Sequence, residues 1–205
     1  MAASSSVRFW GTVVAVRPRL TLAKFEGETT ARCEGHLYVV EGTRTVGSER
    51  PVPGGYVVAV GPATQERRAV RPGDLLRGDA RPVPEGHPDT PADLYRVGTF
   101  HVLARAGDPG ASASREPDPP RTDAPLTPPQ AEAAPRRPLD PANLADGGPC
   151  RPCPYGTIVA VVRLSDPRDW RRGEWRQVPA CLGPVDCPYY VRPATGNLSA
   201  ASGSD

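Results

Sequence analysis

The sequence has no apolar run close to the roughly 18 residues that a membrane-spanning helix requires. Its first residues, MAASSSVRFW, lack the apolar h-region of a signal peptide. Lysine is nearly absent, since all of the 25 basic residues except Lys24 are Arg, and the formal charge of +2 is too small to require an anionic partner. We therefore expect a soluble, cytoplasmic protein with no membrane partner.

Large apolar side chains are scarce between residues 106 and 148. This segment contains 10 of the 27 Pro residues, no aromatic residue, and three large aliphatic side chains. So little apolar area cannot offset about 1 to 2 kcal/mol of backbone entropy per ordered residue. The sequence therefore predicts a first folded domain over residues 1–105, a disordered Pro-rich linker over 106–148, a second small domain over 149–192, and a disordered tail over 193–205.

The first domain has the pattern of a mainly β protein. Five short runs of alternating or apolar residues are bounded by Gly, Pro or Asp, without a convincing helical stripe. They cover residues 7–22, 36–42, 55–61, 74–83 and 95–105. Five strands in about 100 residues favour a small barrel of the oligonucleotide/oligosaccharide-binding (OB) type, although an SH3-like barrel or a small sandwich would give a similar pattern.

Basic and aromatic residues alternate near the expected binding face of such a barrel. We expect Arg17, Arg19, Lys24 and Arg32 in the loop after the first strand, with Tyr38 on the next strand. Bases stack on aromatic rings while guanidinium groups hold phosphates, so this set indicates a contact with single-stranded nucleic acid. The alternative is that Phe9, Trp10, Tyr38 and Tyr56 are core or half-buried barrel residues.

Four of the five cysteines lie in the second domain, in two pairs. Cys150 and Cys153 have the spacing of a zinc knuckle, and Cys181 and Cys187 follow a strand, a turn and a second strand. This layout predicts a zinc-ribbon-like β-hairpin in which a structural Zn²⁺ stabilises a segment too short for a large core. A [4Fe-4S] cluster is an alternative, because Pro follows Cys153 and Cys187 and the second spacing is wide. Disulfides or buried thiols are a third interpretation.

The expected hairpin carries aromatic and basic side chains in the segment RDWRRGEWRQ. Arg171, Arg172 and Trp175 would give a contact surface for nucleic acid or protein at the hairpin tip. The alternative is that the Trp residues pack the hairpin and the metal site while the Arg residues are solvated.

Both predicted domains resemble an uncharacterised prokaryotic family that has a barrel-like N-terminal part and a C-terminal four-cysteine part. The matching residues are 11–19, the CRPC pair, and the CLGPVDCPYY segment from Cys181 to Tyr190. The resemblance implies the same division of the chain and the same grouping of the cysteines, but no activity.

The sequence as a whole favours a non-enzymatic binding protein. The three His residues have no ligand-like spacing and no partner nucleophile, and no small-molecule substrate is indicated. We expect a protein that is stabilised by a structural metal ion and that contacts single-stranded nucleic acid or a nucleoprotein assembly. The alternatives are a protein-protein adaptor with a purely structural zinc site and an iron-sulfur protein.

Overall fold

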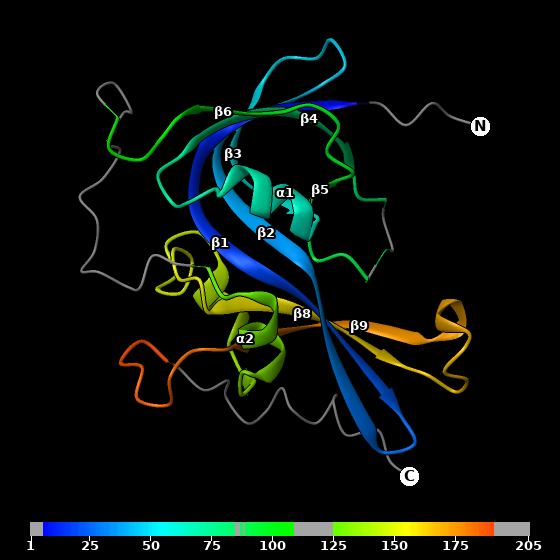
Figure 1. Cartoon of the computed structure of the whole chain (residues 1–205). Coiled ribbons are helices and arrows are strands. Elements are labelled where there is room, and N and C mark those ends of the chain that lie inside the picture. Colours follow the sequence, from blue (N-terminus) through cyan, green and yellow to red (C-terminus); the bar gives the residue numbers. More distant parts are fainter. Residues whose placement is uncertain (1–5, 85–86, 88, 109–124, 191–205) are drawn as a thin grey trace.

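The computed structural model describes residues 6–84, 87, 89–108 and 125–190, which are mainly β (Figure 1). The tail predicted over 193–205 lies outside the described residues. The strands are β1 (Val7–Phe25), β2 (Glu28–Val46), β3 (Val52–Val60), β4 (Leu75–Pro82), β5 (Leu94–Tyr95), β6 (Phe100–Ala104), β7 (Arg137–Pro138), β8 (Gly156–Arg163) and β9 (Glu174–Cys181). The helical elements are α1 (Pro62–Arg68), α2 (Pro128–Ala133) and the 3-10 turns η1 (Pro141–Leu144) and η2 (Trp170–Arg172).

Five of the strands close a barrel, which confirms the barrel expected from the sequence. The strands follow one another in the order β1-β2-β3-β5-β4, and β4 pairs back onto β1 from Val7↔Ala80 to Thr12↔Leu75. The β3–β5 pairing is parallel and the others in the ring are antiparallel. The fifth strand predicted over 95–105 is instead two strands, β5 and β6, and α1 between β3 and β4 was not predicted.

The barrel is filled by the side chains that alternate inward along each strand. Phe9, Tyr38, Val40, Tyr56 and Leu76 are among the buried members of this core. The ring of Phe9 lies opposite Gly78, where an added Cβ would come within 2.6 Å of it. Glycine at this position therefore lets β4 pass close over the aromatic ring.

The first two strands are longer than predicted, because both extend beyond the barrel as a two-stranded ribbon. Each has 19 residues, and they are joined at Glu26 and Gly27. Residues Arg17, Arg19, Lys24 and Arg32 are consequently on strands rather than in a loop. The ribbon provides the free edge of β1 to which the rest of the chain adds.

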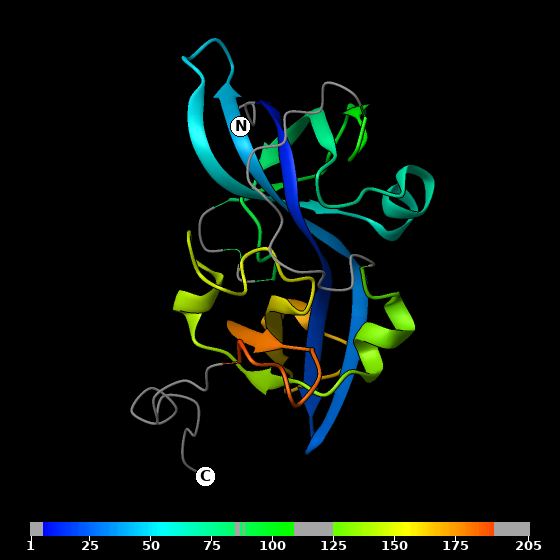
Figure 2. The same cartoon turned by 90° about the vertical axis from the view of Figure 1, so that its left-hand side faces the viewer.

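The second domain expected from the sequence is joined to the barrel by the same sheet. The hairpin β8–β9 forms as predicted, and β8 pairs in parallel with β1 from Thr21↔Ala160 to Lys24↔Arg163. β9 in turn pairs with the short strand β7. Figures 1 and 2 show the strands β8 and β9 beside the ribbon and beneath the barrel.

The prediction of a disordered linker over residues 106–148 is wrong for the second half of that segment. Residues 109–124 lie outside the described residues, but residues 125–148 contain α2, β7 and η1. Ala131 of α2 is fully buried beside Leu20 of β1, and the Glu132 carboxylate accepts the amide of Cys33 in β2 at 2.8 Å. The few apolar residues of this segment suffice because β1, β2 and β8 supply the remaining apolar surface.

Candidate functional site

Three of the four cysteines expected to bind a metal lie in one buried cluster. Cys150 and Cys153 are in the turn before β8, where the amide of Cys153 donates to the carbonyl of Cys150 over 3.1 Å. Cys181 is the last residue of β9 and pairs with Gly156 at the start of β8. The β8–β9 pairing therefore brings the two segments together, and the three cysteines pack with Leu139.

The fourth cysteine is not a member of this cluster. Cys187 is half-buried in the turn after β9, where its amide donates to the carbonyl of Pro184 over 3.3 Å. Within the part of the chain that the structure describes, no group of three or more His, Cys, Asp or Glu side chains is placed to hold a metal ion. Three of the cysteines thus come close in the fold, and Cys187 lies outside their cluster.

A buried guanidinium joins the barrel strand β1 to the cysteine turn. Arg17 is 5% exposed and donates from Nη2 to the carbonyls of Cys150 (3.0 Å) and Arg151 (2.6 Å). Its Nε donates to the carbonyl of Cys153 over 3.3 Å. Burial lowers the pKa of Arg17 to about 10, against the effect of the nearby Cys153 and Cys150 thiols, which raise it. The side chain stays charged at neutral pH and, being buried, cannot reach a nucleic acid.

A second guanidinium lies on the other side of the cluster. The Nη2 atom of Arg137 in β7 is 3.5 Å from Sγ of Cys181, and its guanidinium is 4.0 Å from the ring centroid of Tyr190. Arg137 also donates to the carbonyls of Gly183, Pro184 and Val185. Among the ion pairs of the described residues, neither Arg17 nor Arg137 has a carboxylate partner. Two positive charges therefore adjoin the cysteines without an acidic side chain to match them.

The remaining barrel residues predicted to contact nucleic acid are scattered. Tyr38 is in the barrel core, where its hydroxyl donates to Oε1 of Gln65 over 2.6 Å, and burial together with the Asp74 charge raises its pKa. Arg19 pairs with Glu34 at 2.9 Å. Lys24 is half-buried and Arg32 exposed, both on the protruding ribbon. The structure does not bring these residues onto one surface.

The aromatic residues of the β8–β9 hairpin pack on one another at its tip. Trp170 and Trp175 have ring centroids 6.4 Å apart, and Nε1 of Trp175 donates to the carbonyl of Trp170 over 3.3 Å. Arg172 is exposed and pairs with Asp169, whereas the side chain of Arg171 lies outside the described residues. Figure 1 shows this tip at the end of the hairpin opposite the cysteine turns.

The structure reveals a surface on the barrel that the sequence analysis did not identify. Phe9, Tyr38 and Tyr56 are core residues, as the alternative interpretation held, but Trp10 is 47% exposed. It lies in an open hollow of about 300 Å³ that is lined by Arg8, Phe9, Trp10, Thr43, Thr45, Arg77 and Leu103. Adjacent strand residues point to opposite faces, so the burial of Phe9 alone indicates that Trp10 points outward.

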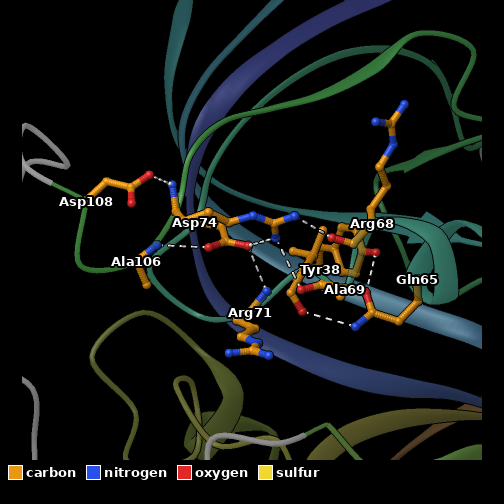
Figure 3. A network of polar contacts seen from close by, with 10 residues as sticks. Tyr38, Gln65, Arg68, Ala69, Arg71, Asp74, Ala106 and Asp108 are labelled. Atoms are coloured by element: carbon orange, nitrogen blue, oxygen red, sulfur yellow. Dashed lines mark hydrogen bonds and ion pairs between the residues drawn. The ribbon is translucent and has the colours of Figure 1, made fainter.

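A second hollow, of about 350 Å³, lies along β6. It shares Leu103 and is lined by Arg67, Arg68, His101, Val102, Leu103, Ala104, Arg105 and Asp108. Beside it, the buried Asp74 accepts from Arg105 Nη1 at 2.9 Å and from the amides of Arg71 and Ala106, both at 3.0 Å (Figure 3). This network fixes the end of β6 against the turn before β4.

Among the described residues, no helix is long and apolar enough to cross a membrane. No protein-family model, curated protein or solved structure matches the chain.

Proposed function

We propose that this protein is a non-enzymatic binding protein whose barrel contacts single-stranded nucleic acid. The observation that carries the proposal is the strand order of the closed barrel, β1-β2-β3-β5-β4-β1, with a helix between β3 and β4. This is the arrangement of the OB fold, whose members bind oligonucleotides and oligosaccharides. The Arg-rich, Lys-poor composition supplies guanidinium groups, which hold phosphates and stack on bases.

The test is a salt series of binding to a fluorescent single-stranded oligothymidine of about 15 nucleotides, a length that covers one OB-type site. Neutralised phosphates release counterions, so log affinity should fall linearly with log salt concentration. Absence of measurable binding at low salt would refute the proposal.

We further propose that the cysteine cluster binds a structural metal centre. Zn²⁺ is the first candidate and an iron-sulfur cluster is the second. Three cysteines already share one buried cluster, and thiolate is the ligand that both groups prefer. Four thiolates around Zn²⁺ carry a net charge of −2, which the charges of Arg17 and Arg137 would match. Cys187 would complete the ligand set by a shift of its turn, whose carbonyls Arg137 already contacts.

Metal analysis of the purified protein tests this second proposal. We expect about one equivalent of zinc per chain, lost in the Cys153→Ser variant and kept in a Cys33→Ser control, because Cys33 lies in β2 outside the cluster. Broad visible absorbance after anaerobic purification would identify an iron-sulfur cluster instead. Metal-free protein after reconstitution with either metal would contradict both assignments.

A protein-protein adaptor is the second candidate function. The exposed Trp170, which packs on the half-buried Trp175 at the hairpin tip, favours it, because Trp is among the residues enriched at the energetic centres of interfaces. An adaptor would hold its partner after nuclease treatment, and the Trp170→Ala variant would lose that partner.

A further inference from the structure

The usual ligand surface of an OB barrel is partly covered in this protein. That surface comprises the face of strands 2 and 3 with the loops joining strands 1–2 and 4–5. Here Arg151 of the cysteine turn pairs with Glu41 of β2 at 3.4 Å and lies against Gly55 of β3. Gln177 of β9 reaches the carbonyl of Thr90, between β4 and β5, at 3.5 Å. The C-terminal part of the chain therefore contacts both strands and one loop of the usual surface.

The neighbouring face, formed by β1, β4 and β6, presents an aromatic ring between basic side chains. Trp10 of β1 lies directly across from Arg77 of β4, and Arg8 is the next outward residue of β1. Leu103 of β6, which is 50% exposed, lines the same hollow. Figure 2 shows the first half of β1 with β2 and β3 on one side and β4 and β6 on the other.

The charges on this face are mainly positive. Arg8 and Arg77 line the hollow of Trp10, and Arg81 is the exposed outward residue two positions beyond Asp79 on β4. Asp79, half-buried opposite Arg8, is the acidic residue of this row. In the second hollow Arg67 and Arg68 add two more guanidinium groups and Asp108 adds one carboxylate, while the charge of Arg105 is matched by the buried Asp74. A polyanion is therefore the partner that this surface complements.

We propose that this face, centred on Trp10, is a binding site for single-stranded nucleic acid. One base stacks on the exposed indole ring, Arg8 and Arg77 hold the phosphates on either side, and the strand continues along β6 toward Arg67 and Arg68. This assignment rests on the proposed function, because it names the surface through which the barrel would bind. An exposed ring with flanking cations is the combination that sequence-tolerant single-strand binding requires, since every base has a π-face and every nucleotide a phosphate.

The experiment compares two tryptophan variants of the full chain by fluorescence anisotropy with the labelled oligothymidine. Trp10→Ala should weaken binding roughly tenfold or more, and Trp10→Phe should restore much of the affinity because it keeps an aromatic face. Trp170→Ala is the matched control, since Trp170 is 36% exposed at the distant hairpin tip, and we expect it to bind as the wild type does. Arg77→Gln should lower the salt slope by about one.

Two further measurements separate stacking from a general loss of structure. Trp10→Ala and the wild type should bind an abasic oligonucleotide of the same length equally, because that ligand keeps its phosphates and lacks the bases. In a Trp170→Phe/Trp175→Phe protein, Trp10 is the one remaining tryptophan, and oligothymidine should quench its fluorescence with the same midpoint as the anisotropy change.

The outcomes distinguish the site from the function. Tight binding that survives Trp10→Ala but fails in Trp170→Ala would overturn the site and leave nucleic-acid binding intact. Binding that neither variant changes would also overturn the site. No binding by the wild type at low salt would overturn the proposed function itself.

Discussion

The Nη2 atom of Arg17 lies 2.6 Å from the carbonyl oxygen of Arg151, across a sequence separation of 134 residues. This contact and the two to Cys150 and Cys153 join the barrel to the turn that carries the first cysteine pair. A residue that the sequence placed at a nucleic-acid surface is thereby part of the connection between the two parts of the chain.

Replacing Arg17 with Met should destabilise the protein, because the carbonyls of Arg151 and Cys153 would lose the guanidinium donor, while that of Cys150 would keep only the amide of Cys153. Each unsatisfied buried acceptor costs about 1 to 3 kcal/mol, so we expect the free energy of unfolding to fall by about 2 kcal/mol or more. Urea unfolding followed by circular dichroism measures the change. Arg32→Met, on the exposed side of β2, is the matched control and should stay within about 0.5 kcal/mol of the wild type. If the free energy of unfolding fell no further in Arg17→Met than in Arg32→Met, the prediction would be contradicted.

Replacing Asp74 with Asn should also be strongly destabilising. The carboxylate is 1% exposed and accepts hydrogen bonds from two backbone amides and from Arg105. In the variant, the side-chain NH₂ group of Asn would face some of these donors and could not accept a hydrogen bond from them. Breaking one side of a buried ion pair costs about 3 to 5 kcal/mol, and the partial exposure of Arg105 brings our expectation to the lower end. Thermal unfolding of Asp74→Asn against Glu66→Gln, an exposed site on α1, tests this. An unchanged melting temperature in Asp74→Asn would contradict it.

The stability of the protein should fall at mildly acidic pH because of His36. Its imidazole is 4% exposed, and burial lowers its pKa below the ordinary value of 6.5, although a hydrogen bond to the backbone of Leu126 acts in the opposite direction. The unfolded chain therefore binds a proton that the folded chain does not, and stability present above pH 6.5 is lost as the pH falls below it.

Urea unfolding at a series of pH values measures this effect in the wild type and in His36→Gln. The variant should lose the part of the pH dependence that comes from His36, whereas His101→Gln, on the exposed side of β6, should keep it. A pH dependence identical in the wild type and in His36→Gln would refute the assignment.

A fragment that ends at residue 108 should fold its barrel but associate with itself. Without β8, the backbone of β1 from Thr21 to Lys24 becomes an unpaired edge, and Leu20 loses its cover from Val159 and Val161. Exposed edges of this kind pair with other chains. Light scattering should detect oligomers, and hydrogen exchange should be faster in the lower half of β1 than in the full chain. A monomeric fragment with unchanged protection there would show that the barrel is independent.

The parts of the fold that follow from local patterns could be predicted. Alternation along each strand, interrupted by Gly and Pro, indicated the barrel strands and the β8–β9 hairpin, because side-chain period and turn chemistry are properties of neighbouring residues. The pairing of that hairpin also brought Cys150, Cys153 and Cys181 together. The sequence alone thus indicated most of the barrel strands, the β8–β9 hairpin and the proximity of three of the four cysteines, whereas β7, the separation of β5 from β6 and the position of Cys187 outside the cluster were not predicted.

Contacts between distant segments were decided by the tertiary structure alone. Whether β8 stands apart or pairs with β1 depends on an open sheet edge, which no local pattern reveals. The folding of residues 125–148 likewise depends on apolar surface supplied by other strands, and the burial of Arg17 on carbonyls that arrive from the C-terminal turn. The exposure of Trp10 depends on which faces of the closed barrel remain uncovered, because neighbouring residues fix only the direction of a side chain and not what packs against it.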